Sequence, residues 1–310
     1  MSKIFTQVLD WLDKCERQLR QRLFKLRMVA TGELRPSSYP YISGDSFRSL
    51  AEHIHDETGS FNPEDVKTAD IVFVGQNYIL EYLSTTHKRI QNKYILISHN
   101  SDSPIDKKVQ LLLDDKIISL FSQNVDIEDP RIIPIPIGLE NLHIHINGIT
   151  SFYNKTIGRV INKKKNKKSE VLYGFSTNTN PEERGLAKKY LKSYPNASTP
   201  SRFIAPKRHL ALLATYCFVA SPPGNGIDCC RTWEALYVRT IPIVKDSITT
   251  RYFKSLGLPL LIVKNWTELS NYDKKALRNK YNELTQNAKW DALYMDFWIN
   301  KIEQTKKLNK

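Results

Sequence analysis

The chain has 310 residues, of which 41% are hydrophobic and 25% charged, and its net charge at pH 7 is +14. This composition is typical of a globular protein, and the length is enough for two domains of ordinary size. The charge favours ligands that carry phosphate, anionic membranes or nucleic acid, whereas the absence of any apolar segment near 18 residues excludes a membrane-spanning helix.

Residues 2–29 are predicted to form one basic helix, which we count as an N-terminal segment over residues 1–30. Apolar side chains recur every seven positions, at Phe5, Leu12, Leu19 and Leu26, and Lys and Arg side chains occupy the other faces. Two interpretations stay open: a helix docked on the body or forming a short coiled-coil arm, and an amphipathic helix lying on anionic lipid. The segment lacks the apolar core of a signal peptide, so we expect a cytosolic protein, peripheral on the membrane under the second interpretation.

Near-continuous apolar runs at residues 71–75, 94–98 and 117–121 predict the strands of a parallel sheet that is covered on both faces. Before them, residues 43–54 are predicted to be a capped helix. In this helix Asp45 fits either an N-cap or a catalytic base.

Polar residues follow the second of these runs. His99, Asn100 and Asp102 come directly after the strand, where ligands of open α/β sheets bind. His99 or Asp102 is therefore a candidate for the base that takes a proton from an attacking hydroxyl group. The alternative is that Asn100 and Asp102 only shape a turn.

The division between two domains is placed within residues 147–169. The run of lysines at residues 163–168 is interpreted as a solvated linker or loop. The second domain is expected to begin with a strand at residues 171–176, followed by a helix at residues 184–192. Arg184 lies near the start of that helix.

The most informative stretch is residues 218–245. An apolar strand leads into a turn with two prolines and two glycines, and a helix over residues 229–237 and a second apolar strand follow. Asp228 is predicted to be the N-cap of the helix. Glycines let a ligand approach the backbone closely, and a helix N-terminus attracts phosphate.

Arg231 and Glu234 are three residues apart and project from roughly one side of this helix. The arginine can bind a diphosphate, and the carboxylate can accept hydrogen bonds from two ribose hydroxyls. This describes a site for a sugar nucleotide. The alternative is that the two residues merely pair on a solvated face.

The residues Ser-Pro-Pro-Gly-Asn-Gly-Ile-Asp (221–228), Arg-Thr-Trp-Glu-Ala-Leu (231–236) and Ile-Pro-Ile-Val (241–244) resemble the C-terminal signature of exostosin-like glycosyltransferases. Weaker similarity runs from about Tyr39 to Trp298. Cys230 stands where the motif often has His. Arg239 stands where it usually has Gly, which predicts loss of the left-handed helix cap.

The resemblance implies an α/β protein of the GT-B fold, with two Rossmann-like domains facing a central cleft. We expect domains at residues 31–149 and 150–284, and a helix at residues 285–310 that crosses back with aromatic packing. It also implies transfer of a sugar with inversion, by a hexosyl- or pentosyltransferase, without an essential metal or a cofactor. Pro242 is consistent with inversion, because retaining enzymes of this fold often have a second Glu at the corresponding position.

The expected donor is a nucleotide sugar, and the expected acceptor is a glycan or lipid-linked glycan of a cell surface or capsid. Nucleic acid is not an expected partner, because no basic platform with interleaved aromatic residues is present. The expected donor-binding residues are Arg184, Ser221, Pro223, Gly224, Asn225, Gly226, Asp228, Arg231 and Glu234. The expected catalytic base is Asp102, His99 or Asp45, with Arg48 and Asn100 on the acceptor side.

Three alternatives stay open: a sugar-nucleotide epimerase on the same scaffold, an inactive sugar-binding relative, and a basic nucleic-acid-binding protein. Cysteine use does not separate them. Cys15, Cys217, Cys229 and Cys230 include no Cys-x-x-Cys pair, and a reducing compartment with buried thiols is the simplest interpretation.

Overall fold

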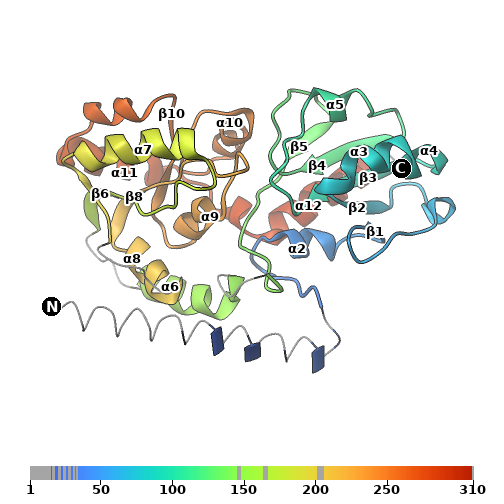
Figure 1. Cartoon of the computed structure of the whole chain (residues 1–310), viewed down its shortest axis with the longest axis horizontal. Coiled ribbons are helices and arrows are strands. Elements are labelled where there is room, and N and C mark those ends of the chain that lie inside the picture. Colours follow the sequence, from blue (N-terminus) through green and yellow to red (C-terminus); the bar gives the residue numbers. More distant parts are fainter. Residues whose placement is uncertain are drawn as a thin grey trace.

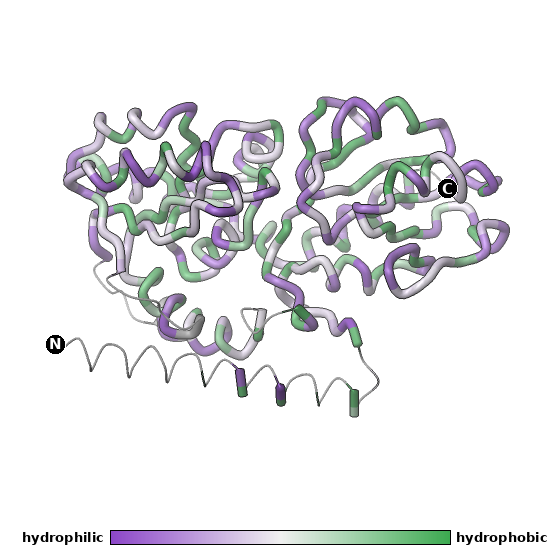
Figure 2. The backbone as a smooth tube through the Cα atoms, in the orientation of Figure 1, coloured by the Kyte–Doolittle hydropathy of each residue, from purple (hydrophilic) through white to green (hydrophobic). Residues whose placement is uncertain are grey.

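The computed structural model describes residues 34–144, 148–162, 167–200 and 206–308, with isolated positions between 15 and 32 (Figure 1). The described strands form two five-stranded parallel sheets, in the orders β1-β2-β3-β4-β5 and β10-β9-β8-β6-β7. Hydrophobic residues concentrate on the strands inside each lobe (Figure 2). The predicted α/β class with two parallel sheets is therefore confirmed.

The first sheet owes its position in the core to β-branched and aromatic strands whose side chains are buried on both faces. Its strands are β1 (His53–His55), β2 (Ile71–Gly75), β3 (Tyr94–His99), β4 (Ile117–Ser122) and β5 (Ile132–Pro134). Its helices are α2 (Gly44–Arg48), α3 (Ile79–Ser84), α4 (Thr86–Arg89) and α5 (Lys107–Gln110), with 3₁₀ turns η1 (Pro63–Asp65) and η2 (Gln76–Tyr78).

The second sheet is covered by longer helices, several of which have side-chain N-caps. Asn180 accepts a hydrogen bond from the Glu183 backbone at the start of α7, and Ser247 and Thr250 form a capping box on α10. The strands are β6 (Lys168–Leu172), β7 (Ala197–Ser198), β8 (Tyr216–Ala220), β9 (Ile241–Lys245) and β10 (Leu261–Val263). The helices are α6 (Thr150–Asn162), α7 (Pro181–Ser193), α8 (Pro206–Leu213), α9 (Cys230–Tyr237), α10 (Ile248–Ser255) and α11 (Lys274–Gln286), with 3₁₀ turns η4 (Trp266–Asn271) and η5 (Asp291–Leu293).

The last described helix, α12 (Met295–Leu308), follows the second sheet in sequence but packs on the first domain (Figure 1). The Met295 backbone N–H donates to the Pro40 carbonyl at 3.0 Å. The buried Trp298 ring meets the Phe47 ring edge-on at 6.3 Å between centroids. The predicted crossover is confirmed, and its aromatic residue serves packing.

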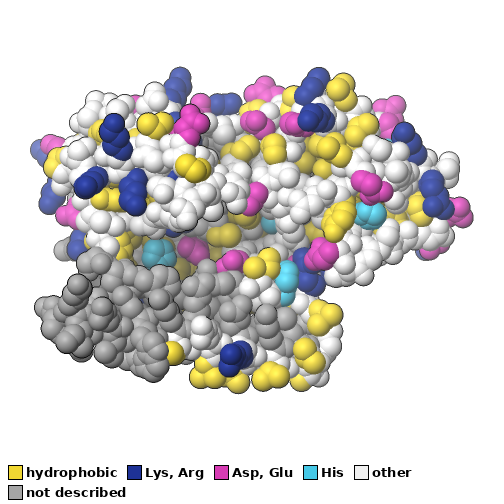
Figure 3. Space-filling model, viewed as in Figure 1, with side chains coloured by type: hydrophobic (Ala, Val, Ile, Leu, Met, Phe, Trp, Pro, Cys, Tyr) yellow, Lys and Arg dark blue, Asp and Glu magenta, His cyan; other side chains and the backbone are white. Residues whose placement is uncertain are grey.

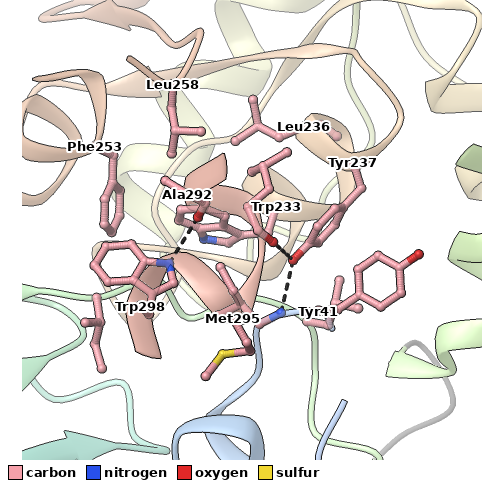
Figure 4. Close-up of a cluster of buried hydrophobic side chains, with 14 of the residues drawn as sticks. Tyr41, Trp233, Leu236, Tyr237, Phe253, Leu258, Ala292, Met295 and Trp298 are labelled. Atoms are coloured by element: carbon pink, nitrogen blue, oxygen red, sulfur yellow. Dashed lines mark hydrogen bonds between the residues drawn. The ribbon is translucent and has the colours of Figure 1, made fainter. Parts of the chain in front are cut away.

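A single cluster of buried side chains joins the two domains beside this crossover. Figure 4 shows Tyr237 of α9 directing its hydroxyl into the junction, where it accepts a hydrogen bond from the Ile42 backbone at 3.1 Å and donates one to the Leu293 carbonyl at 2.6 Å. One hydroxyl thereby connects three chain segments that are far apart in sequence.

Several local predictions were wrong. The first helix ends at Arg48 instead of reaching Ile54, because residues 53–55 pair with β2 as strand β1. The lysine run is not wholly solvated either. Lys167 is 8% exposed, and its ammonium donates to Thr240 Oγ1 and to the carbonyls of Ala214, Tyr216 and Val238.

The carbonyls of Ala214 and Val238 lie at the C-terminal ends of α8 and α9, where a positive charge is favourable. Burial nevertheless lowers the pKa of Lys167 to about 8. Residues 163–166 of the run lie outside the described residues.

The helix cap at Arg239 is also different from the prediction. Arg239 adopts φ 60°, the left-handed conformation that glycine reaches more easily. Its guanidinium carbon lies 3.7 Å from the centre of the Trp290 ring, and such cation–π contacts are stabilising. The left-handed helix cap is therefore present with Arg239 in the place of the glycine. The contact with the Trp290 ring offsets the energetic cost of this backbone conformation.

Candidate active site

The carboxyl-end loops of the two sheets meet across the boundary between the domains. Asn225 Nδ2, after β8, donates to Asp102 Oδ2, after β3, at 3.1 Å. A cavity of about 310 Å³ opens beside them, and residues of both domains line it. Figure 3 shows Asp, Glu and His side chains along the hollowed middle of this face. The lining residues are Gly44, His99–Asp102, Gln123, Ile137, Leu139–Asn141, Ile144 and Cys230.

Asp228 holds the domains together instead of capping α9. The helix begins at Cys230 with Cys229 as its N-cap, so the predicted N-cap was wrong by one residue. The Asp228 carboxylate accepts hydrogen bonds from the Ile137 backbone at 2.9 Å, Trp233 Nε1 at 2.7 Å and the Cys229 backbone at 2.8 Å. Burial raises the pKa of Asp228 to about 6, although these hydrogen bonds act to lower it.

The glycine-rich turn is packed against side chains from two directions. A Cβ atom on Gly224 would lie 2.8 Å from Arg184 Nη2, and one on Gly226 would lie 2.7 Å from Asn124 Nδ2. A side chain at either glycine would therefore require Arg184 or Asn124 to shift. Asn124, from the first domain, also accepts a hydrogen bond from the Asp228 backbone at 3.0 Å.

Arg184 is buried beneath this turn. Its Nε donates to the Pro223 carbonyl at 2.9 Å, and its Nη1 donates to the Ser176 carbonyl at 3.0 Å. Among the residues that the structure describes, no carboxylate lies within ion-pair distance of it. Burial lowers the pKa of Arg184, and the nearby positive charge of Arg231 acts in the same direction, whereas the charges of Cys229 and Asp102 oppose the shift. Ser221 has a packing role, since its hydroxyl lies 3.0 Å from Thr232 Oγ1.

Arg231 and Glu234 do not pair with each other. Arg231 Nη2 donates to the Gly174 carbonyl at 3.0 Å, and its guanidinium carbon lies 5.8 Å from the centre of the Phe175 ring. Glu234 forms a hydrogen bond with the side chain of Tyr153, on α6. Burial raises the pKa of Glu234 to about 7, because the opposing charge of Arg231 compensates only in part.

The raised pKa makes the contribution of Glu234 to stability depend on pH. Its pKa is about 7 in the fold and 4.5 ordinarily, so the wild type loses stability as pH rises from about 4.5 to 7. Glu234→Gln cannot ionise and does not share this loss. The free energy of unfolding of the variant, relative to wild type, should therefore increase by about 2 kcal/mol between pH 5 and pH 8.

Urea denaturation at both pH values measures this difference. Glu283→Gln on α11 is the matched control, because Glu283 is 62% exposed and, among the described residues, forms an ion pair with Lys280 alone. The difference in free energy of unfolding between Glu283→Gln and wild type should be the same at both pH values. If the free energies of unfolding of wild type and Glu234→Gln change with pH in parallel, the pKa of Glu234 is not raised by burial.

On the other side of the cavity, His99 is buried and both of its ring nitrogens are occupied. Nδ1 accepts from the Asn100 backbone at 2.7 Å, and Nε2 lies 3.0 Å from the Pro136 carbonyl, to which it donates. Burial lowers the pKa of His99 to about 4. Its ring is therefore neutral at pH 7 and fixed in one orientation.

The other acceptor-side candidates differ in their surroundings. Asp45 is fully buried and binds Arg35 and His143. Asp102 is exposed and bonds to the glycine-rich turn. Arg48 binds Asp56 at 2.7 Å instead of facing the cavity.

Asn100 is held in the left-handed region at φ 68°, where its Oδ1 accepts from Asn141 Nδ2 at 2.8 Å. Its Nδ2 is buried and has no hydrogen-bond partner among the described residues. Sequence reasoning missed Asn124, Asn141, His143, Tyr153 and His209. Of these, His209 lies near Arg231, and burial together with that charge lowers its pKa to about 4.

Within the described ranges, no group of three or more His, Cys, Asp or Glu side chains is arranged to hold a metal ion. In the same ranges, no helix has both the length and the apolar character that crossing a membrane requires.

Two parallel α/β domains with their carboxyl ends facing one cleft, joined by a returning C-terminal helix, define a two-domain Rossmann-like fold of the GT-B type. No protein-family model matches the chain, and neither does any curated protein sequence.

Among solved structures, the chain is similar to the N-terminal domain of trehalose-6-phosphate phosphatase from Candida albicans. The identity is 13%, the match covers 78% of this chain and 73% of that chain, and the TM-score is 0.41. It is also similar to TarM, with 11% identity, coverage of 76% of this chain and 51% of that chain, and a TM-score of 0.34. The chain thus spans about half the length of TarM. Both TM-scores are below 0.5, so the fold assignment depends on the two sheets and the crossover helix.

Proposed function

We propose that this protein is an inverting glycosyltransferase that uses a nucleotide sugar, with a UDP-sugar as the first candidate. One observation carries the proposal. Arg184 and Arg231 lie close enough beside the glycine-rich turn for their positive charges to interact, and neither forms an ion pair among the described residues, while the charges of Asp102 and Glu234 act against this repulsion from beyond ion-pair distance. A diphosphate would neutralise both charges, and Arg is the side chain best suited to bind it.

The remaining donor contacts are assigned around this pair of arginines. Glu234 lies close enough to Arg231 for their charges to interact, and its carboxylate accepts hydrogen bonds from ribose hydroxyls in the proposal. The resemblance of residues 221–244 to the exostosin-like signature supports the same assignment. Two like charges beside one turn are expected where an anionic ligand binds.

The acceptor in the proposal is a glycan or lipid-linked glycan hydroxyl that enters the cavity beside Asn100, Asp102 and Asn141. A cavity of about 310 Å³ is of the size that holds a small ligand. The transfer requires neither a metal nor a cofactor in this proposal. Donor and acceptor would meet where the two domains face each other.

The proposal includes a cytosolic location with peripheral contact to anionic membrane through the N-terminal helix. Most of residues 1–30 lie outside the described residues. Among the described positions, Leu19, Leu23 and Leu26 are exposed by 60%, 57% and 66%. Exposed leucines on a basic helix are typical of binding to a lipid surface.

A binding and turnover screen tests the proposed function. UDP, GDP and CDP are compared in thermal shift, and the matching nucleotide sugars are then assayed for release of the nucleotide with and without glycoside acceptors. We expect at least one nucleoside diphosphate to raise the melting temperature, with acceptor-dependent release of that nucleotide.

Other outcomes of the screen select the alternatives. Conversion of the donor without an acceptor indicates an epimerase. Binding without any turnover indicates an inactive sugar-binding relative, and steeply salt-dependent binding to DNA or RNA indicates a nucleic-acid-binding protein. If no nucleotide binds, the proposed function is wrong.

A further inference from the structure

We propose that His143, oriented by Asp45, accepts the proton of the acceptor hydroxyl during transfer. This inference rests on the proposed function, because it assigns the base of that reaction. Neither residue belongs to the glycine-rich motif, and His143 was not a candidate from the sequence. The pair lies on the first-domain side, opposite the two donor arginines.

Asp45 cannot itself be the base, because its carboxylate is already used. Oδ2 lies 2.7 Å from His143 Nδ1, and Oδ1 accepts from Arg35 Nε at 2.8 Å and lies 2.6 Å from Arg35 Nη2. Burial raises the pKa of Asp45, but the hydrogen bonds from His143 and Arg35 outweigh it and hold the pKa below its ordinary value. The group is therefore a carboxylate at neutral pH and a fixed acceptor for His143.

His143 has the complementary geometry. Its Nδ1 donates to Asp45, so in the neutral form of the ring Nε2 is the nitrogen that carries no proton. Nε2 has no hydrogen-bond partner among the described residues, and the side chain is 22% exposed. A ring fixed by a carboxylate at one nitrogen and open at the other is the arrangement of a general base.

The pair adjoins the cavity, because a sequence neighbour of each residue lines it. Gly44 precedes Asp45, Ile144 follows His143, and both line the cavity. The Asp45 backbone donates to Asn141 Oδ1 at 2.9 Å, and Asn141 is also a lining residue. Asp45, and through its hydrogen bond the imidazole, is thereby held next to the wall of the cavity, although neither residue is itself a lining residue.

The competing candidates are less suited to the task. His99 is buried, and both of its nitrogens have backbone partners. Asp102 is exposed, and its Oδ2 already accepts a hydrogen bond from Asn225 Nδ2 of the glycine-rich turn at 3.1 Å. An imidazole titrates near neutral pH, where general-base catalysis is most effective.

The step balances without a further reactant. The acceptor oxygen forms a bond to the anomeric carbon while the bond from that carbon to the diphosphate oxygen breaks. The leaving nucleoside diphosphate keeps the electron pair, and the hydroxyl proton moves to His143 Nε2. The imidazolium pairs with Asp45 and then releases its proton to water.

His143→Asn is the decisive variant, because the Asn amide can still donate to Asp45 but offers no basic nitrogen. With the nucleotide sugar and glycoside selected by the screen, we expect kcat to fall by about 100-fold to 10,000-fold while the Kd for UDP is unchanged. Wild-type kcat/KM should decrease on the acid side of a single ionisation, and this decrease should disappear in the variant. The charged groups around the ring are Arg35 and Asp45, with Glu140 and Asp102 along the cavity.

Two further variants separate catalysis from structure. His143→Ala should regain part of its turnover with added imidazole, which a merely structural role would not produce. His55→Asn is the control, because His55 bonds to Ser60 away from the cavity and should keep wild-type kcat.

If His143→Asn keeps near-normal turnover while Asp102→Asn is inactive, the base is Asp102 and the inference is overturned, with the proposed function intact. If wild type binds no nucleotide, the proposed function and the inference fail together.

Discussion

Asp228→Ala is expected to lower the free energy of unfolding by about 3–5 kcal/mol. The substitution leaves three N–H donors without this acceptor: Trp233 Nε1, which is buried, and the part-buried backbones of Ile137 and Cys229. Each unsatisfied buried donor costs about 1–3 kcal/mol, and the three losses share one site, so they do not add fully. Urea denaturation followed by tryptophan fluorescence measures the change.

Asp126→Ala is the matched control for this variant. Asp126 is exposed, so its change should stay within about 0.5 kcal/mol of wild type. The loss of free energy of unfolding for Asp228→Asn should lie between those of Asp228→Ala and Asp126→Ala. The amide oxygen can still accept a hydrogen bond, but the amide nitrogen must face one of the N–H donors. A loss below about 1 kcal/mol for Asp228→Ala would mean that the domains are held together elsewhere.

Arg231→Gln is expected to weaken binding of UDP by about 10-fold to 100-fold and to leave binding of uridine almost unchanged. In the proposed site the guanidinium binds the diphosphate, and charge-assisted hydrogen bonds contribute about 1.5–3 kcal/mol. Arg231→Lys should recover only part of the loss, because an ammonium cannot reproduce the planar fork. Calorimetry with UDP and uridine at pH 8 distinguishes these effects.

Glu234→Gln is the control that tests the other half of the nucleotide. It removes the charge that strengthens hydrogen bonds to ribose, so it should weaken UDP and uridine alike. At pH 8 the wild-type carboxyl is mostly ionised, since its pKa is about 7. If both variants bind UDP like wild type, helix α9 does not hold the donor.

The central strands could be predicted from sequence because nearly all of their residues are apolar. Strands β2, β3 and β8 are buried at every position, so burial on both faces leaves a continuous signal. Strand β1 carries no such run, since two of its three residues are histidines. Its conformation comes from pairing with β2, which no local pattern records.

The candidate site was predictable only where its residues are close in sequence. The turn and helix of residues 218–245 hold Arg231 and Glu234 within three positions of each other. Asp228 instead meets Ile137, which is 91 residues away, and His143 meets Asp45 across 98 residues. His143 lies in a turn without periodicity, and only the fold brings it to the cavity.

The returning helix has a consequence for the order in which the protein is made. Helix α12 is synthesised after all ten described strands, yet Trp298 and Ile302 belong to the same buried cluster as Phe73, Ile97 and Phe121 of the first sheet. Synthesis proceeds at about 5–20 residues per second, so one face of the first sheet stays exposed to solvent for many seconds before helix α12 can pack on it. The first domain should therefore be a chaperone client throughout translation, although it emerges first.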